Sequence, residues 1–172
     1  MEQHVHDWTS RNRWMYFISM IPFVAVFPGT AWLLAQYSIT VMLIFIGLYL
    51  LANIFQAGAC VGCPYRGRYC PAIFGVYLGN ILSATMYRKR EFEPKFFRVN
   101  ANAAEIMVFV VMGFPVYWLY LAGWPWLGLY VALLVLHVVI FMPSQCSYCS
   151  YNETCPGGLT WLACRRWLAR EK

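Results

Sequence analysis

Six of the seven cysteines in this chain fall into two triplets of similar spacing. The first triplet reads C-x2-C-x6-C-P and the second reads C-x2-C-x5-C-P. Their members are Cys60, Cys63 and Cys70, and Cys146, Cys149 and Cys155. A gap of two residues lets both thiolates of a turn face one metal ion, and a third cysteine on the returning loop closes the site. Because proline also follows the last cysteine in bacterial ferredoxin sequences, the triplets predict two metal-binding loops.

The sequence leaves the metal open between iron–sulfur clusters and zinc, because both accept cysteine thiolates. Disulfides are disfavoured, because the loops are expected on a reducing cytoplasmic face. Two complete four-cysteine sites would need eight thiolates in total, and the chain has seven cysteines. At least one site therefore uses another kind of ligand, an exchangeable position or a residue from a partner, unless the two triplets share a single site.

Four residues outside the triplets are candidates for an additional ligand. They are Cys164, His4, His6 and His137. Cys164 is expected to be buried on the apolar side of the last helix, and the two N-terminal histidines belong to a surface arm. His137 lies within an apolar segment, where an ionisable side chain is a candidate haem ligand, quinone partner, proton relay or interhelical hydrogen-bonding group. Leu51 occupies the matching position of the first half, so no symmetric pair of haem ligands is expected.

Cationic and hydroxyl side chains lie next to the cysteines in both loops. They are Tyr65, Arg66, Arg68 and Tyr151. Such groups stabilise a negatively charged cluster and raise its reduction potential. Lipid phosphate is an equally good partner for the two arginines.

The loops are expected to be positioned by membrane helices, because 61% of the residues are hydrophobic and only 12% are charged. Four apolar segments are long enough to cross a bilayer: 14–35, 39–57, 103–122 and 126–142. Pro28 and Pro115 should kink these helices without ending them. All basic residues lie outside the two short hairpin turns. The positive-inside rule then predicts a multi-pass protein of the inner (cytoplasmic) membrane with both termini in the cytoplasm. The net charge of +6 fits this topology and anionic lipid, so no nucleic-acid partner is expected.

The chain also contains an internal repeat. FPGTAWLLA from Phe27 matches FPVYWLYLA from Phe114, and IFQAGACVGCPYRGRYCP from Ile54 matches IFMPSQCSYCSYNETCP from Ile140. Each half ends in a segment with one apolar side, at 72–87 and 159–170, which predicts an amphipathic helix in the headgroup layer. The expected fold is all-α, with four transmembrane helices as two parallel-repeated hairpins, each followed by a cysteine loop and an interfacial helix.

This organisation divides the chain into four segments. They are a cytoplasmic arm (1–13), a first repeat unit (14–87), a cytoplasmic linker (88–102) and a second repeat unit (103–172).

The segments after the CP cysteines resemble those of a known family. YCPAIFGVYLGNIL from Tyr69 and TCPGGLTWLACRRWL from Thr154 carry the pattern. They resemble the membrane part of the polyferredoxin-type quinol dehydrogenases that serve periplasmic nitrate and nitrous-oxide reductases. That family has four membrane helices and two cytoplasmic cysteine loops ending in CP. It differs in spacing its CP cysteines by three residues and in continuing into ferredoxin repeats. The resemblance implies electron transfer near quinones.

The sequence therefore favours a membrane subunit that binds iron–sulfur clusters at the cytoplasmic face and links a partner protein to the quinone pool. It would work as one subunit of an oxidoreductase complex rather than as an enzyme alone. The alternative is a non-redox scaffold or assembly subunit in which the same loops hold structural zinc. A thiol-dependent metal transporter is a third reading, disfavoured because the apolar segments contain no paired polar path.

Overall fold

The computed structural model describes residues 10–61, 66, 76–145, 153 and 156–170. Over these residues every regular element is an α-helix. The helices are α1 (Ser10–Tyr37), α2 (Ile39–Ala59), α3 (Val76–Met86), α4 (Pro94–Gly113), α5 (Val116–Ala122), α6 (Trp124–Gln145) and α7 (Pro156–Arg170). The prediction of an all-helical protein is confirmed for the described part of the chain.

Three spans are long and apolar enough to cross a membrane: Ile39–Ala59, Pro94–Ala122 and Trp124–Pro143. They overlap three of the four predicted crossings, so the prediction of membrane helices holds for these spans. Pro94–Ala122 begins within the segment 88–102 that was predicted as a linker, because α4 is helical from Pro94 onward. α1 covers the fourth, but its apolar part, Ile21–Tyr37, is shorter. The fourth crossing therefore stays a prediction.

The helices that contain Pro28 and Pro115 differ in how they accommodate the ring. α1 continues as helix through Pro28. At Pro115 the helix is interrupted between Gly113 and Val116, although the backbone remains right-handed there and the apolar span continues to Ala122. Proline lacks an N–H and its ring crowds the carbonyl four residues earlier, which explains the interruption.

Tyr130 of α6 satisfies a carbonyl at this interruption. Its hydroxyl donates a hydrogen bond of 2.8 Å to the Met112 carbonyl oxygen, from a buried position in the core beside Leu119. A neighbouring helix thus supplies the partner that a broken membrane helix needs, as the sequence predicted.

Tyr130→Phe is expected to lower stability by about 1 kcal/mol, the usual size of an interhelical hydrogen bond in a membrane. For a chain of this length that corresponds to a fall of about 2–4 °C in the melting temperature. Thermal unfolding in detergent, followed by circular dichroism, measures the effect. Tyr120→Phe, at an exposed position of α5, should melt with the parent. An equal fall in both variants would refute the assignment.

Both turns between the predicted crossings, α1 to α2 and α5 to α6, are short, as expected. Ser38 alone separates α1 from α2, and Gly123 alone separates α5 from α6. Gly123 has a φ of 119°, in the region that glycine adopts without steric cost.

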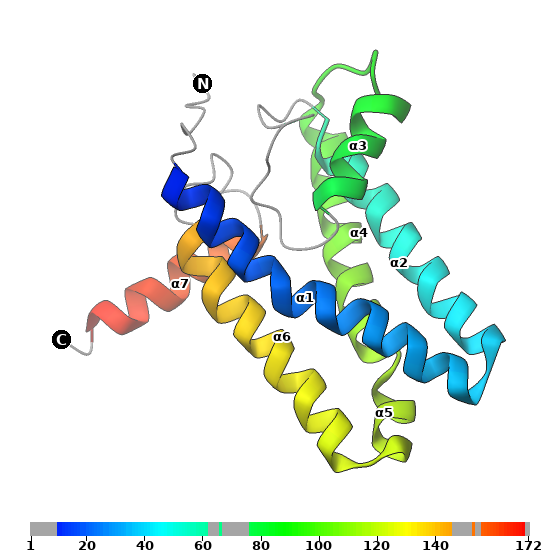
Figure 1. The fold of residues 1–172 in the computed structure, drawn as a ribbon. Coiled ribbons are helices and arrows are strands. Elements are labelled where there is room, and N and C mark those ends of the chain that lie inside the picture. The colour runs from blue at the N-terminus through cyan, green and yellow to red at the C-terminus, as the bar shows by residue number, and fades with distance from the viewer. Residues whose placement is uncertain (1–9, 62–65, 67–75, 146–152, 154–155, 171–172) are drawn as a thin grey trace.

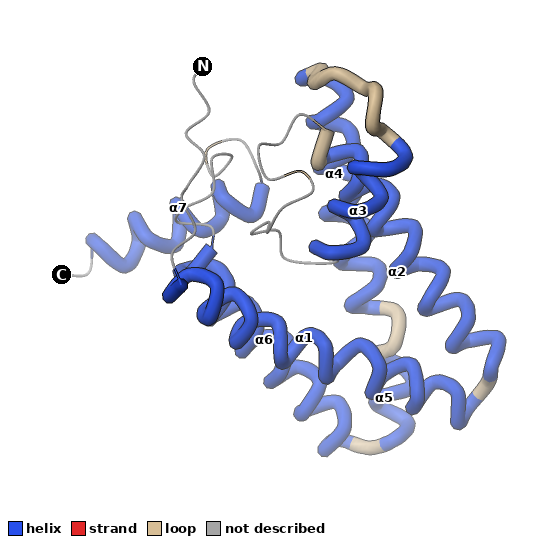
Figure 2. The backbone as a smooth tube through the Cα atoms, turned by 45° about the horizontal axis from the view of Figure 1, so that its top comes forward, coloured by secondary structure: helices blue, strands red, loops and turns tan. Residues whose placement is uncertain are grey.

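The helices pack in two principal pairs (Figure 1). α1 lies along α6, and α2 lies along α4, while α1 and α2 contact each other less extensively. α3 packs on α2, and α7 touches the bundle only through limited contacts with α4 and α6. Figures 1 and 2 show that α2 and α6 finish at the same end of the bundle, where α1 and α4 begin. We call this the Cys60 end.

Candidate functional site

Both cysteine triplets begin directly after a helix that is long and apolar enough to span a membrane. Cys60 follows the last residue of α2, and Cys146 follows the last residue of α6. Since α2 and α6 finish at the same end of the bundle (Figure 2), the two loops leave the helices on the same side. Of the six triplet cysteines, Cys60 lies within the described residues. Cys63, Cys70, Cys146, Cys149 and Cys155 lie outside them.

Cys60 is held in a buried and polar position. Its residue is 5% exposed, and its backbone N–H donates to the Gln56 carbonyl oxygen at 3.0 Å, which continues the last turn of α2. The side-chain Nε2 of Gln56 lies 3.8 Å from Cys60 Sγ and donates a hydrogen bond to it. An N–H group directed at sulfur stabilises a thiolate, so this position suits a metal-binding cysteine.

The described part of the chain contains no group of three or more histidine, cysteine, aspartate or glutamate side chains close enough to hold a metal ion. Five of the six predicted cysteine ligands lie outside those residues, and so do the candidate additional ligands His4 and His6. Among the triplet cysteines, only Cys60 is described and can be compared with a metal-binding thiolate. It is buried and receives an N–H···S hydrogen bond, as such ligands commonly do.

Arg66 connects the first cysteine loop to α3. Its Nη2 donates to the backbone carbonyl oxygen of Ser83 from a partly buried position. The guanidinium of Arg66 thus binds a backbone carbonyl oxygen. The sequence had suggested a metal cluster or a lipid phosphate as its partner. Tyr65, Arg68 and Tyr151 lie outside the described residues.

α3 lies close against α2, next to the residue that contacts Cys60. A Cβ added to Gly79 would lie 2.9 Å from Gln56 Cγ and 3.4 Å from the Asn53 carbonyl oxygen, so only glycine allows this approach. The segment expected as an interfacial amphipathic helix is therefore packed on the bundle along one side. Ile81 and Met86 remain exposed on α3.

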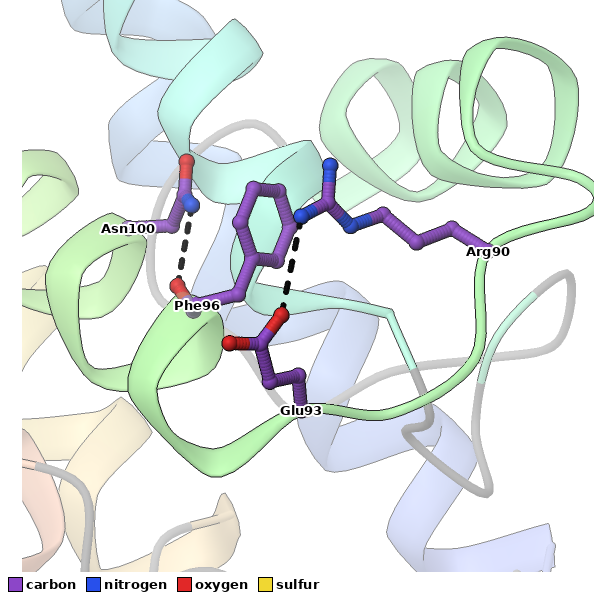
Figure 3. A network of polar contacts seen from close by, with 4 residues as sticks. All are labelled: Arg90, Glu93, Phe96 and Asn100. Atoms are coloured by element: carbon purple, nitrogen blue, oxygen red, sulfur yellow. Dashed lines mark hydrogen bonds and ion pairs between the residues drawn. The ribbon is translucent and has the colours of Figure 1, made fainter.

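The turn between α3 and α4 is fixed by a small polar network (Figure 3). The Arg90 guanidinium lies 3.6 Å from the centre of the Phe96 ring, and Arg90 Nη2 is 3.8 Å from Glu93 Oε2. Asn100 Nδ2 donates to the Phe96 carbonyl oxygen at 2.9 Å. The ion pair is exposed and contributes little, whereas Asn100 is buried against α2.

The predicted burial of Cys164 is wrong. Cys164 is exposed, and so are Trp167 and Leu168 on the same side of α7. α7 projects away from the bundle (Figure 1) and makes only limited contacts with α4 and α6, so Cys164, Trp167 and Leu168 remain exposed, whereas Trp161 and Leu162 are half-buried. Arg165 and Arg166 are also exposed on α7, and the helical period places Arg166 on the side away from Leu168.

His137 is fully buried in α6. Its ring centroid lies 5.7 Å from that of Phe23 and 5.4 Å from that of Phe141, so it is packed between aromatic rings of α1 and α6. Leu51, taken as its counterpart in the first half, is 41% exposed, whereas the adjacent Ala52 is 7% exposed. The interior position that matches His137 is therefore Ala52, one residue later than the cysteine spacing indicated. Neither residue supplies a second histidine.

A cavity of about 30 Å³ lies between α1, α2, α4 and α6. Most of its lining is aromatic or aliphatic, including Phe27, Phe45 and Tyr49, and Asn53 and Gln56 add two amides. A cavity that holds benzene measures roughly 150 Å³, whereas one water needs about 10–15 Å³. In this arrangement the cavity admits water but not a quinone ring.

The amides of α2 were missed by the sequence analysis. Asn53, Gln56 and Cys60 follow one another at intervals of three and four residues, which places them on one face of the helix. The signal was present, because two amides in the last turns of an apolar span are unusual and favour an interhelical role.

Comparison with protein-family models, curated proteins and solved structures finds no match. The functional argument therefore rests on the residues of this chain, and the resemblance to the quinol dehydrogenase membrane part remains a prediction from its motifs.

Proposed function

We propose that this chain is a membrane electron-transfer subunit that holds iron–sulfur clusters through its two cysteine triplets and links a partner protein to the quinone pool. The observation that carries the proposal is the position of Cys60. It follows a membrane-spanning helix directly, is buried, and receives an N–H···S hydrogen bond from Gln56. Hydrogen bonds to sulfur and low solvent exposure are among the features that set the reduction potential of such clusters.

The proposal includes a duplicated architecture with four crossings. Helix packing supports it. In the repeat α1 corresponds to α4 and α2 corresponds to α6. The α1–α6 contact is therefore equivalent to the α4–α2 contact, and these are the two most extensive helix pairs. Two pairs of buried positions in α2 and α6 correspond at the same offset. Phe45 and Ala52 of α2 match Tyr130 and His137 of α6, and all four are buried. Such pairing is expected of two hairpins related by an axis along the membrane normal.

We place the Cys60 end at the cytoplasmic face of the inner membrane, with both termini on that side. The basic residues between Arg88 and Arg98 lie in the turn and first part of α4 at this end, as the positive-inside rule requires. α7 would lie in the headgroup layer. Its exposed Trp167 and Leu168 would face the acyl chains, and Arg165 and Arg166 would face anionic lipid.

In this reading Cys60 and its triplet partners hold the cluster, which supplies one-electron transfer when bound. Gln56 orients the Cys60 sulfur through the N–H···S contact. Arg66 fixes the loop to α3, and Gly79 lets α3 cover Gln56. These contacts restrict the access of water to the first cysteine.

A non-redox scaffold subunit in which the cysteine loops bind structural zinc is the second candidate. The hydrogen bond between Arg66 and the Ser83 carbonyl oxygen favours it. The loop after Cys60 is tied to the Ser83 carbonyl oxygen, so a closed thiolate site there would clamp α3 onto α2. Structural zinc sites contribute folding free energy of this kind.

Anaerobic purification followed by metal and acid-labile sulfide analysis separates the candidates. The electron-transfer subunit should be brown, contain iron and sulfide, and give an electron paramagnetic resonance signal on reduction. Colourless protein with stoichiometric zinc would instead support the zinc-binding scaffold and exclude the electron-transfer subunit. Protein without either metal would overturn both.

A further inference from the structure

The last two turns of α2 carry a line of polar side chains that faces the bundle. Asn53 is 2% exposed. Its Nδ2 donates to the Tyr49 carbonyl oxygen at 2.8 Å, one turn earlier in the same helix. Its Oδ1 is buried and accepts no hydrogen bond from the described residues. A buried amide oxygen in this state has lost its hydration without compensation, which is unfavourable unless a further donor is bound.

Asn53 lines the interhelical cavity together with Gln56. The cavity measures about 30 Å³, which is room for one or two water molecules at roughly 10–15 Å³ each. Such a water needs two or more polar partners. The two amide side chains supply them in a lining that is otherwise mainly apolar. The size of the cavity selects water over a lipid tail or a ring-shaped cofactor.

We propose that this cavity is a water-binding site within the four-helix bundle, in which an ordered water donates a hydrogen bond to Asn53 Oδ1. Gln56 extends the polar line from this water toward Cys60, because its Nε2 contacts Cys60 Sγ. The bound water satisfies the hydrogen-bonding capacity of Asn53 Oδ1. Together with Gln56 it forms a row of polar groups along α2 from the bundle interior to Cys60. The proposal does not depend on the metal, since Asn53 and the cavity are present whatever Cys60 binds.

A crystal structure grown in lipid, at a resolution that shows ordered waters, is the direct test. Density for one or two waters within hydrogen-bonding distance of Asn53 Oδ1 is the expected result. A cavity without density, or one filled by a hydrocarbon chain, would overturn the proposal.

Magnetisation transfer from water to side-chain amides, measured by nuclear magnetic resonance in nanodiscs, tests the same site in solution. Asn53 should show a cross-peak to water, and Ala104→Leu, which fills the cavity from α4, should abolish it. Asn100 is the internal control. It is also buried and its Nδ2 also bonds a carbonyl oxygen four residues earlier, but it does not line the cavity. Its transfer from water should be the same in the parent protein and in Ala104→Leu. No transfer to Asn53 in the parent protein would contradict the proposal.

Discussion

Cys60→Ser is expected to remove the metal bound by the first triplet. Serine presents a protonated hydroxyl where a metal requires a soft thiolate, so affinity for iron–sulfur clusters or zinc should be lost. Metal per chain should fall by about half if the triplets hold separate ions, and almost completely if they share one site. Elemental analysis and acid-labile sulfide on anaerobically purified protein measure the change. The side chain is small enough to leave the end of α2 in place.

Cys164→Ser is the matched control, because it makes the same chemical change at an exposed cysteine on α7. Its metal content should equal that of the parent. Full metal content in Cys60→Ser would remove Cys60 from the site and with it the observation on which the proposed function rests. A loss in both variants would instead make Cys164 an additional ligand, one of the alternatives that the cysteine count leaves open.

The membrane spans could be predicted because their composition alone determines them. α2, the α4–α5 span and α6 overlap predicted segments, since an unbroken apolar run of this length has few alternatives to a spanning helix. The start of α4 at Pro94 was missed, because its first turns are partly polar and were read as a linker. The effect of Pro115 was also predictable, because the missing N–H is local chemistry. That Tyr130 would satisfy the Met112 carbonyl oxygen was not, since the partner comes from another helix.

The pairing of the helices could not be read from the sequence. In lipid, apolar side chains facing a neighbouring helix and those facing acyl chains have the same hydrophobicity. Leu51 and Ala52 are both suitable for either environment, and only the structure shows that Ala52 faces the interior. The same reasoning explains the error at Cys164. An apolar side on α7 indicates an apolar neighbour without telling whether that neighbour is protein or lipid.

The candidate site was predictable in its residue types and incomplete in its surroundings. The spacing of the cysteines identified Cys60. Gln56 was overlooked because its role depends on α3 lying over it and on the turn that brings Cys60 within reach. These are tertiary contacts, which periodicity alone does not specify.

Gly58→Ala is expected to disrupt the packing of α2 on α4. A Cβ at Gly58 would lie 2.3 Å from Asn100 Oδ1 and 2.4 Å from Asn100 Cγ. Asn100 cannot turn away without losing its 2.9 Å bond to the Phe96 carbonyl oxygen. Overpacking of this kind costs about 1–3 kcal/mol, and losing the hydrogen bond adds about 1 kcal/mol. Thermal unfolding in detergent should show a lower melting temperature than that of the parent. Size-exclusion chromatography should show a broader distribution of particle sizes.

Gly47→Ala is the control on the same helix, because a Cβ there meets nothing within 4 Å. Alanine favours helix over glycine by up to about 1 kcal/mol, so this variant should be as stable as the parent or more so. Asn100→Ala removes the two clashing atoms and should restore most of the stability lost in Gly58→Ala. Equal stability of Gly58→Ala and Gly47→Ala would mean that α2 and α4 do not meet at Gly58.

Cys60 lies two residues beyond Gly58, so separating α2 from α4 should also displace the Cys60 sulfur. Metal content should then fall in Gly58→Ala and recover with Asn100→Ala, which ties the helix packing to the site by a measurement independent of stability.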